Sequence, residues 1–171
     1  GQTFVTATAQ LQLDSSVTIT GETITINGPA TNNQGALNGV SGTNVWAGPV
    51  ILGNTVNTRI GATAGTLTIS GVIDDGSNTV DLNVRNDVAG TTILSASNTY
   101  GGATNVIVGT LQLAGGSNRL PIGSSLSIGN GSNVDTATLN LNGQSQQVAG
   151  LTSAGTTMAM TVTSVAAATL T

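Results

Sequence analysis

The sequence predicts an all-β fold, and more specifically a β-solenoid in which short strands stack coil upon coil. Apolar residues recur with a period of two wherever a pattern can be read, and helical spacing is not sustained anywhere. Gly and Asn pairs typical of turns separate the alternating segments. Similar segments also return after about two dozen residues, which is typical of stacked repeats. For a chain of 171 residues we expect one domain, 1–171, with no substantial helix.

The expected strands each have one aliphatic face and one face of Thr, Asn, Gln or Ser. In chain order they are 17–20, 24–27, 67–70, 80–84, 111–113, 126–128, 139–141 and 158–162. Turn-forming pairs lie between them, at 27–28, 38–39, 75–76, 101–102, 115–116, 130–131 and 142–143. Short strands joined in this way leave little room for any helix.

Internal repetition distinguishes a solenoid from other all-β folds, and it is clearest within 65–151. Gly-Thr-Leu-Thr-Ile at 65–69 matches 90–94 loosely and 109–113 and 137–141 more closely, so the spacing is irregular. At about 22 residues per coil the chain would form roughly seven to eight coils, a rod of roughly 35 to 40 Å. The structural alternative is a β-sandwich, which has no reason to repeat at this period and usually buries several large aromatic residues.

Charged residues are scarce: the chain has 7 Asp or Glu, 3 Arg and no Lys, His or Cys, for a net charge of −4. These absences exclude nucleophiles activated by His, zinc sites of His or Cys, phosphate-binding P-loops and Schiff bases. Three scattered Arg cannot neutralise a run of phosphates, so we expect no nucleic-acid partner. We therefore expect no enzyme activity and no cofactor.

The one charge-rich region contains Asp74, Asp75 and Asp81, with Arg85 and Asp87 nearby. Three carboxylates could bind Ca²⁺, and a pair could act as acid and base on a glycosidic bond. Adjacent side chains of a strand point to opposite faces, so Asp74 and Asp75 can converge only in a turn. We expect a plain turn with a solvated salt pair, and keep these three residues as the candidate Ca²⁺ ligands.

Other side chains also allow a structural and a functional interpretation. Trp46 could stack on a sugar ring, but an isolated Trp between apolar residues more often fills a core. The tripeptide 130–132, Asn-Gly-Ser, matches a glycosylation acceptor and is also a hairpin turn signal, and we expect the turn. The many Asn could form hydrogen-bonded ladders between coils. We expect the structural role in each case.

Part of the chain resembles a known family. Ile-Leu-Ser at 93–95, Asn-Thr-Tyr-Gly-Gly-Ala-Thr at 98–104 and Val-Gly-Thr-Leu-Gln-Leu at 108–113, with the continuation at 137–151, resemble the autotransporter-associated β-strand repeat, also called the passenger-associated transport repeat. The resemblance covers about 65–151 and is faint before it. It implies a right-handed parallel β-helix in a large bacterial extracellular or surface protein, often an adhesin-like or fibrous passenger. It also implies that Tyr100 packs over a coil edge rather than binding a ligand.

Both ends of the expected solenoid are strand-like, from Thr3 to Leu13 and from Met158 to Thr171, and show no cap in the sequence. We therefore expect self-association through these ends or continuation into a longer chain, and we expect no membrane-inserted helix.

No signal peptide starts the chain, so we expect it to be processed or excised from a longer protein. The function we expect is a non-catalytic extracellular or cell-surface fibre; the alternatives are an adhesin for a host or glycan partner and a polysaccharide-active β-helix enzyme.

Overall fold

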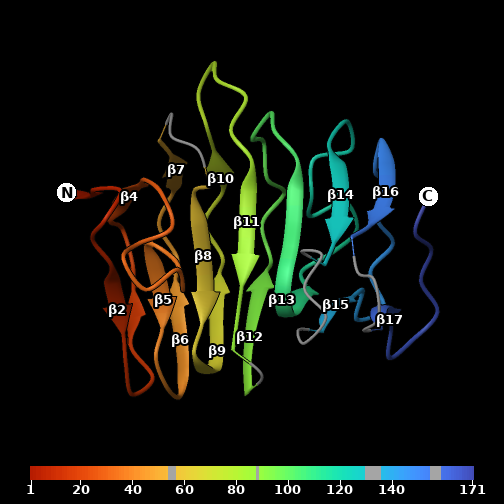
Figure 1. Ribbon diagram of the computed structural model, residues 1–171, viewed down its shortest axis with the longest axis horizontal. Coiled ribbons are helices and arrows are strands. Elements are labelled where there is room, and N and C mark those ends of the chain that lie inside the picture. The colour runs from red at the N-terminus through yellow and green to blue at the C-terminus, as the bar shows by residue number, and fades with distance from the viewer. Residues whose placement is uncertain (54–56, 88, 130–135, 155–158) are drawn as a thin grey trace.

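The computed structural model describes residues 1–171 except 54–56, 88, 130–135 and 155–158, and the described residues contain strands, turns and no helix (Figure 1). The chain winds as a right-handed parallel β-helix, so the predicted fold class is confirmed. Every pairing between the described strands is parallel. In Figure 1 the coils follow one another from the N-terminus at the left to the C-terminus at the right. No helix among these residues is long and apolar enough to cross a membrane.

The strands stack in three rows, which we call sheets A, B and C. Sheet A contains β1 (Gln2–Val5), β4 (Thr23–Ile26), β7 (Val50–Leu52) and β10 (Ile73–Asp74). Sheet B contains β2 (Leu11–Leu13), β5 (Leu37–Gly39), β8 (Arg59–Ala62), β11 (Leu82–Arg85), the first part of β13 (Thr104–Leu113), β14 (Ser125–Ile128) and β16 (Gly150–Ser153). Sheet C contains β3 (Thr18–Ile19), β6 (Thr43–Trp46), β9 (Ala64–Ile69), β12 (Ala89–Leu94), the second part of β13, β15 (Ala137–Asn140) and β17 (Met160–Thr163).

The strand register gives about six turns between the first and last described strands of sheet B, fewer than the seven to eight expected. One column of register partners along this sheet runs through Leu11, Leu37, Ile60, Val84, Val106, Ile128 and Ser153. Most steps in this column are longer than the repeat assumed from the sequence, because loops at the corners of the coil add residues that the strand alternation does not reveal.

The repeat found in the sequence is the register of sheet C. Gly65 pairs with Gly90 and Gly109 with Ala137, while Thr91 pairs with Thr110. One outward row consequently consists of stacked threonines on successive strands: Thr43, Thr66, Thr91, Thr110, Thr138 and Thr161. Neutral hydroxyl side chains in such a row do not repel one another, whereas like charges directly opposite on neighbouring strands would.

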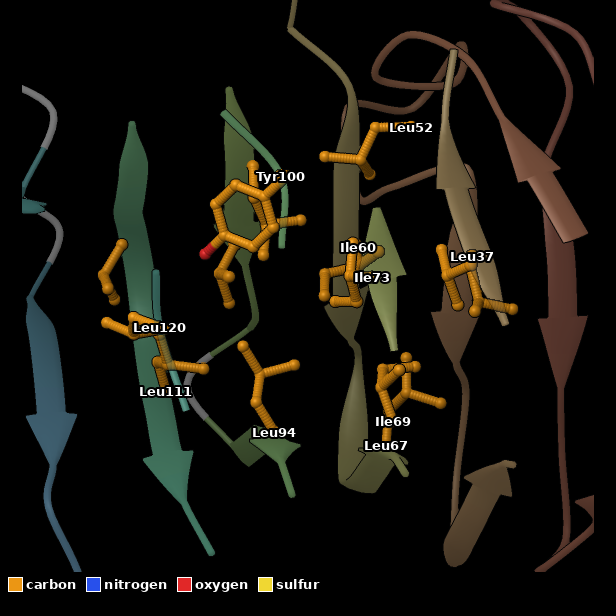
Figure 2. Close-up of a cluster of buried hydrophobic side chains, with 14 of the residues drawn as sticks. Leu37, Leu52, Ile60, Leu67, Ile69, Ile73, Leu94, Tyr100, Leu111 and Leu120 are labelled. Atoms are coloured by element: carbon orange, nitrogen blue, oxygen red, sulfur yellow. The ribbon is translucent and has the colours of Figure 1, made fainter. Parts of the chain in front are cut away.

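The core is a stack of aliphatic side chains between the three sheets. Figure 2 shows leucine and isoleucine side chains of successive coils gathered in this space, with Tyr100 among them. The largest fully buried side chains are Trp46, Tyr100, Ile24, Ile26, Leu37, Leu52, Ile60, Leu67, Ile69, Ile73, Leu82 and Leu94. With few aromatic residues, each layer is filled mainly by inward aliphatic side chains from its strands, and the neighbouring coils cover it.

Candidate interaction surfaces

The acidic region folds as a turn whose carboxylates bind backbone N–H groups. Asp75 is 2% exposed, and its Oδ2 accepts hydrogen bonds from the N–H of Val80 at 2.8 Å and of Gly101 at 3.0 Å. The first bond closes the loop 75–80, and the second joins it to the following coil. A carboxylate buried in this way stabilises the turn because backbone N–H groups replace its hydration.

The two other carboxylates of the region bind separate groups. Asp74 Oδ1 accepts from the N–H of Gly76, and its Oδ2 accepts from the Thr99 hydroxyl, each at 2.5 Å. These bonds, the Thr99 one foremost, lower the pKa of Asp74. Asp81 Oδ1 accepts from the N–H of Ala103 at 2.7 Å. All three carboxylates thus have capping roles in the turn and between coils.

The geometry gives little support to a metal site at these residues. In the part of the chain that the structure describes, no three His, Cys, Asp or Glu side chains gather as a metal-binding group. The salt pair expected here is also not formed, because the single ion pair among the described residues joins the Gly1 amino group to Glu22 at 3.3 Å. The Ca²⁺ site at Asp74, Asp75 and Asp81 stays a prediction, and backbone capping explains the three residues without it.

The large aromatic side chains occupy the core. Trp46 is 2% exposed, so the expected core-filling role is confirmed and no face of the indole is free to stack on a sugar. Tyr100 is 1% exposed and lies inside the coil rather than over its edge; its hydroxyl is 2.6 Å from the Thr104 hydroxyl. The Asn-Gly-Ser tripeptide at 130–132 lies outside the described residues.

Asn and Gln link the coils, as expected, in two different ways. On the outer faces Asn105 Nδ2 donates to Asn83 Oδ1 at 3.2 Å, and Asn140 Nδ2 donates to Gln112 Oε1 at 3.2 Å. These two contacts join successive coils in the manner of a ladder. They are partly buried, so they hold neighbouring strands in register without the cost of burying charge.

A second set of amides, which the sequence did not single out, lies buried at the corners. Asn86 is 1% exposed; its Oδ1 accepts from the N–H of Ala62 at 2.7 Å and its Nδ2 donates to the carbonyl of Thr110 at 2.8 Å. Asn98 bridges the N–H of Ile73 and the carbonyl of Arg119 in the same way, both at 2.8 Å. Each amide therefore joins the coil before it to the coil after it. No periodicity separates these Asn from exposed ones, so no sequence signal could have found them.

The last described coil leaves core positions uncovered. Leu151 pairs in register with the buried Leu126 but is 53% exposed, and Val162 pairs with the buried Leu139 but is 41% exposed. Val165 nearby is 77% exposed. This surface, formed by Leu151, Val162 and Val165, is called the open layer below. Leu151 and Val162 in this surface would form a core layer if another coil lay over them, because their register partners are buried.

The first coil is better covered than the last. Val5 and Leu13 are each 5% exposed, and the exposed apolar side chains are Phe4 at 66% and Val17 at 38%. Of the stretch 3–13, expected to be strand-like, β1 covers residues up to Val5 and β2 covers Leu11–Leu13, with a turn between them. At the other end, the described part of 158–171 contains β17 at Met160–Thr163 and an isolated parallel bridge between Gln146 and Leu170, and Met158 lies outside the described residues.

Comparison with known proteins gives no match: no family model fits the chain, and neither the curated proteins nor the solved structures contain a significant match. The resemblance to the autotransporter-associated repeat therefore stays a prediction. The interpretation of function depends on the surfaces of the coil itself.

Proposed function

We propose that this chain is a non-catalytic structural β-solenoid of an extracellular bacterial fibre or matrix, whose coils continue end to end into a filament or a longer passenger. The observation that carries the proposal is the open layer, in which Leu151 and Val162 occupy core positions and yet are 53% and 41% exposed. Covering such side chains is favourable by about 25 cal/mol for each Å² of apolar surface removed from water.

The backbone at the ends of the coil supports the same proposal. β2 pairs with β5 only, and β17 pairs with β15 only, so each has one row of N–H and C=O groups that no described strand bonds. Such edges bind another strand readily, because the main chain supplies the hydrogen bonds and alternate side chains supply the packing. The parallel register within the chain provides a template for the arrangement of an added coil.

The residues on the outer faces and corners of the coils also suit a fibre. The outward threonine row of sheet C continues over six strands without a charge, and the amides at the corners are satisfied by bonds to the preceding and following coils. Coils of this kind can stack repeatedly because no like charges are brought together. The absence of Cys removes thiol oxidation outside the cell as a source of damage.

The test is the mass of the purified chain as its concentration rises, measured by light scattering and accompanied by electron microscopy. We expect the native chain to form rods longer than one copy. Leu151→Arg and Val162→Arg each place a charge in the open layer and should prevent the association. Thr43→Arg places the same charge on an exposed part of the side wall and should leave the association unchanged.

Three results would contradict the fibre assembled from separate copies. The first is a native chain that stays monomeric at the highest concentration reached. The second is association that persists in both open-layer variants, and the third is equal loss in the Thr43→Arg control. Circular dichroism of each variant should show unchanged strand content, because all three substituted positions are exposed at the surface.

A further inference from the structure

Two of the three Arg lie together on the outer face of sheet B. Arg59 begins β8 and is the register partner of Asn83, and Arg85 follows Asn83 by two positions in the neighbouring strand β11. Residues two apart in a strand point to the same face, so the two Arg are diagonal neighbours within reach of each other. A chain with 3 Arg and no Lys thus has two of its cationic side chains on one small area.

No acidic side chain neutralises this pair. Among the described residues the ion pair of Gly1 with Glu22 is the only one, so neither guanidinium lies within 4.0 Å of a described carboxylate. The nearest acid in the sequence, Asp87, has its Oδ2 bonded to Nε2 of Gln34 at 2.9 Å. Gln34 thus holds this carboxylate by a neutral amide, and the two positive charges lie at a partly exposed surface with no described carboxylate in ion-pair contact.

The donors of the pair are also incompletely used. Arg59 Nη1 donates to the carbonyl and to the Oδ1 of Asn33, at 3.2 and 3.3 Å, but its buried Nε has no partner. The buried Nε of Arg85 likewise has none. The two buried Nε atoms are not reached from solvent, but no hydrogen bond of the described residues uses Nη2 of Arg59 or either Nη of Arg85. These Nη donors are available to a bound acceptor. Burial in the first place, and the charge of Arg85 in the second, lower the pKa of Arg59.

The third Arg provides the contrast within the same molecule. Arg119 donates from Nε and Nη2 to the carbonyl of Ser117, at 3.2 and 2.8 Å, and from Nη1 to the carbonyl of Ser95 at 3.2 Å. Its guanidinium therefore clamps two coils through their backbone. Arg59 and Arg85 have no comparable set of bonds, so coil stacking alone does not explain them.

We propose that Arg59 and Arg85 form an oxyanion-binding site on the outer face of sheet B, and that its ligand is the carboxylate of a uronic acid unit in an acidic polysaccharide. A guanidinium fork matches a carboxylate in geometry and charge. The exposed side chain of Asn33 and the partly exposed side chain of Asn105 lie near the pair and can exchange hydrogen bonds with sugar hydroxyls. This binding activity goes beyond the structural role proposed above and does not depend on it.

The charge of the whole chain favours a sparsely charged polymer as ligand. The net charge is −4, so a partner with dense charge such as a nucleic acid would meet repulsion that two cations cannot offset. An acidic polysaccharide needs only one anion seated between the two guanidinium groups, while its neutral hydroxyls contact the amides. Binding through this pair should weaken as salt is added, because the site lies at the surface.

The experiment is titration calorimetry of the full chain with an oligogalacturonate at low ionic strength, with the neutral oligogalactoside and sodium acetate as separate arms. We expect binding of the oligogalacturonate, no binding of the neutral sugar and much weaker binding of acetate. The double variant R59Q/R85Q should weaken binding by about tenfold or more, the loss expected for charge-assisted hydrogen bonds. Arg85→Gln alone should cause much of this loss, and this variant removes no hydrogen bond that the described residues show.

Two matched variants separate the site from general charge. Arg119→Gln lowers the net charge by as much as Arg85→Gln does and should leave the affinity within about twofold, since that guanidinium is occupied. Asp87→Asn removes the nearby negative charge and should raise the affinity. The proposal is overturned if the native chain does not bind the oligogalacturonate, if Arg85→Gln binds as the native chain does, or if Arg119→Gln loses as much. Acetate binding as tight as that of the oligosaccharide would overturn it too, because the site would then be one for free anions rather than for a polysaccharide.

Discussion

The interior coils and the last described coil place equivalent residues in very different surroundings. Leu126 and Leu151 are register partners in sheet B, on strands of the same sheet and direction, yet they are 1% and 53% exposed. Leu139 and Val162 show the same difference in sheet C, at 0% and 41%. The difference shows that a side chain in this fold is buried only when the next coil covers it, and that its inward position on a strand is not sufficient.

The hydrogen bonds of the buried amides also differ between the interior and the C-terminal end. Asn98 in an interior coil bonds Ile73 on the preceding coil and Arg119 on the following one. The Gln146 side chain, nearer the C-terminal end, bonds back to the N–H and the carbonyl of Leu120, and locally to Gln147. An interior amide therefore couples two layers, whereas the Gln146 side chain is anchored to one.

The largest expected effect tests the difference in burial directly. Leu126→Ala removes a side chain enclosed by coils on both sides and should lower the free energy of unfolding by about 4 kcal/mol, because a cavity is left behind. Leu151→Ala removes the same atoms from a half-exposed position and should cost about 1 kcal/mol. Urea denaturation of monomeric protein measures both. Equal losses would mean that burial by the next coil does not determine the contribution of a core residue.

The part of the fold that could be predicted from the sequence is the part where alternation is strict. In sheet C the repeat at 65, 90, 109 and 137 predicted the register position by position. The segments beginning at 65, 109 and 137 alternate inward aliphatic and outward polar side chains, whereas β12 places Thr92 inward and Ile93 outward, which is why its match is loose.

β6, β7 and β8 were not predicted, and the turn expected at 38–39 is wrong because this pair lies in β5. The outward residue of β7, Ile51, is apolar, so the sequence of β7 does not alternate between apolar and polar residues. In β8 the residue after Ile60 is Gly61, which has no side chain to show a polar face; a Cβ there would overlap the carbonyl oxygen of Arg85.

Candidate sites were predictable only where composition limited the choices. The lack of His, Cys and Lys excluded whole classes of chemistry, and the isolated Trp46 was correctly expected in the core. The corner amides Asn86 and Asn98 and the pairing of Arg59 with Arg85 could not be predicted, because they depend on the length of each coil, which varies from turn to turn. A single insertion in a corner loop would bring different side chains together.

A smaller effect is expected where the neighbouring coil limits the space for a side chain. Gly65 and Gly76 have nearly the same backbone angle, φ of +70° and +67°. A Cβ at Gly65 would overlap the carbonyl oxygen of Gly42 on the preceding coil, whereas at Gly76 nothing lies within 4 Å. Gly65→Ala should cost about 3 kcal/mol, and Gly76→Ala about 1 kcal/mol from backbone strain alone. If the two variants unfold at the same urea concentration, coil-to-coil contact does not restrict Gly65.

The smallest expected effect concerns Tyr100, an interior residue whose hydroxyl bonds within its own coil. Its oxygen is 2.6 Å from the Thr104 hydroxyl, so Tyr100→Phe should cost about 1 kcal/mol at neutral pH. Burial raises the pKa of Tyr100 above its ordinary value of about 10, although the Thr104 hydrogen bond partly opposes this. Because the folded state holds the phenol proton more tightly, this contribution to stability is complete below about pH 10 and is lost as the pH rises further, by up to about 1.4 kcal/mol per pH unit.

The chain has 1 Tyr, so Tyr100→Phe removes this entire alkaline contribution. We therefore expect the stabilities of the native protein and the variant to converge and then cross above about pH 10, when urea denaturation is repeated at increasing pH. Ultraviolet absorbance of the phenolate provides an independent measure: it should appear only when the native protein unfolds. A phenol that ionises near pH 10 while the strands remain intact would show that the interior of the coil is open to solvent, in the manner of the last coil.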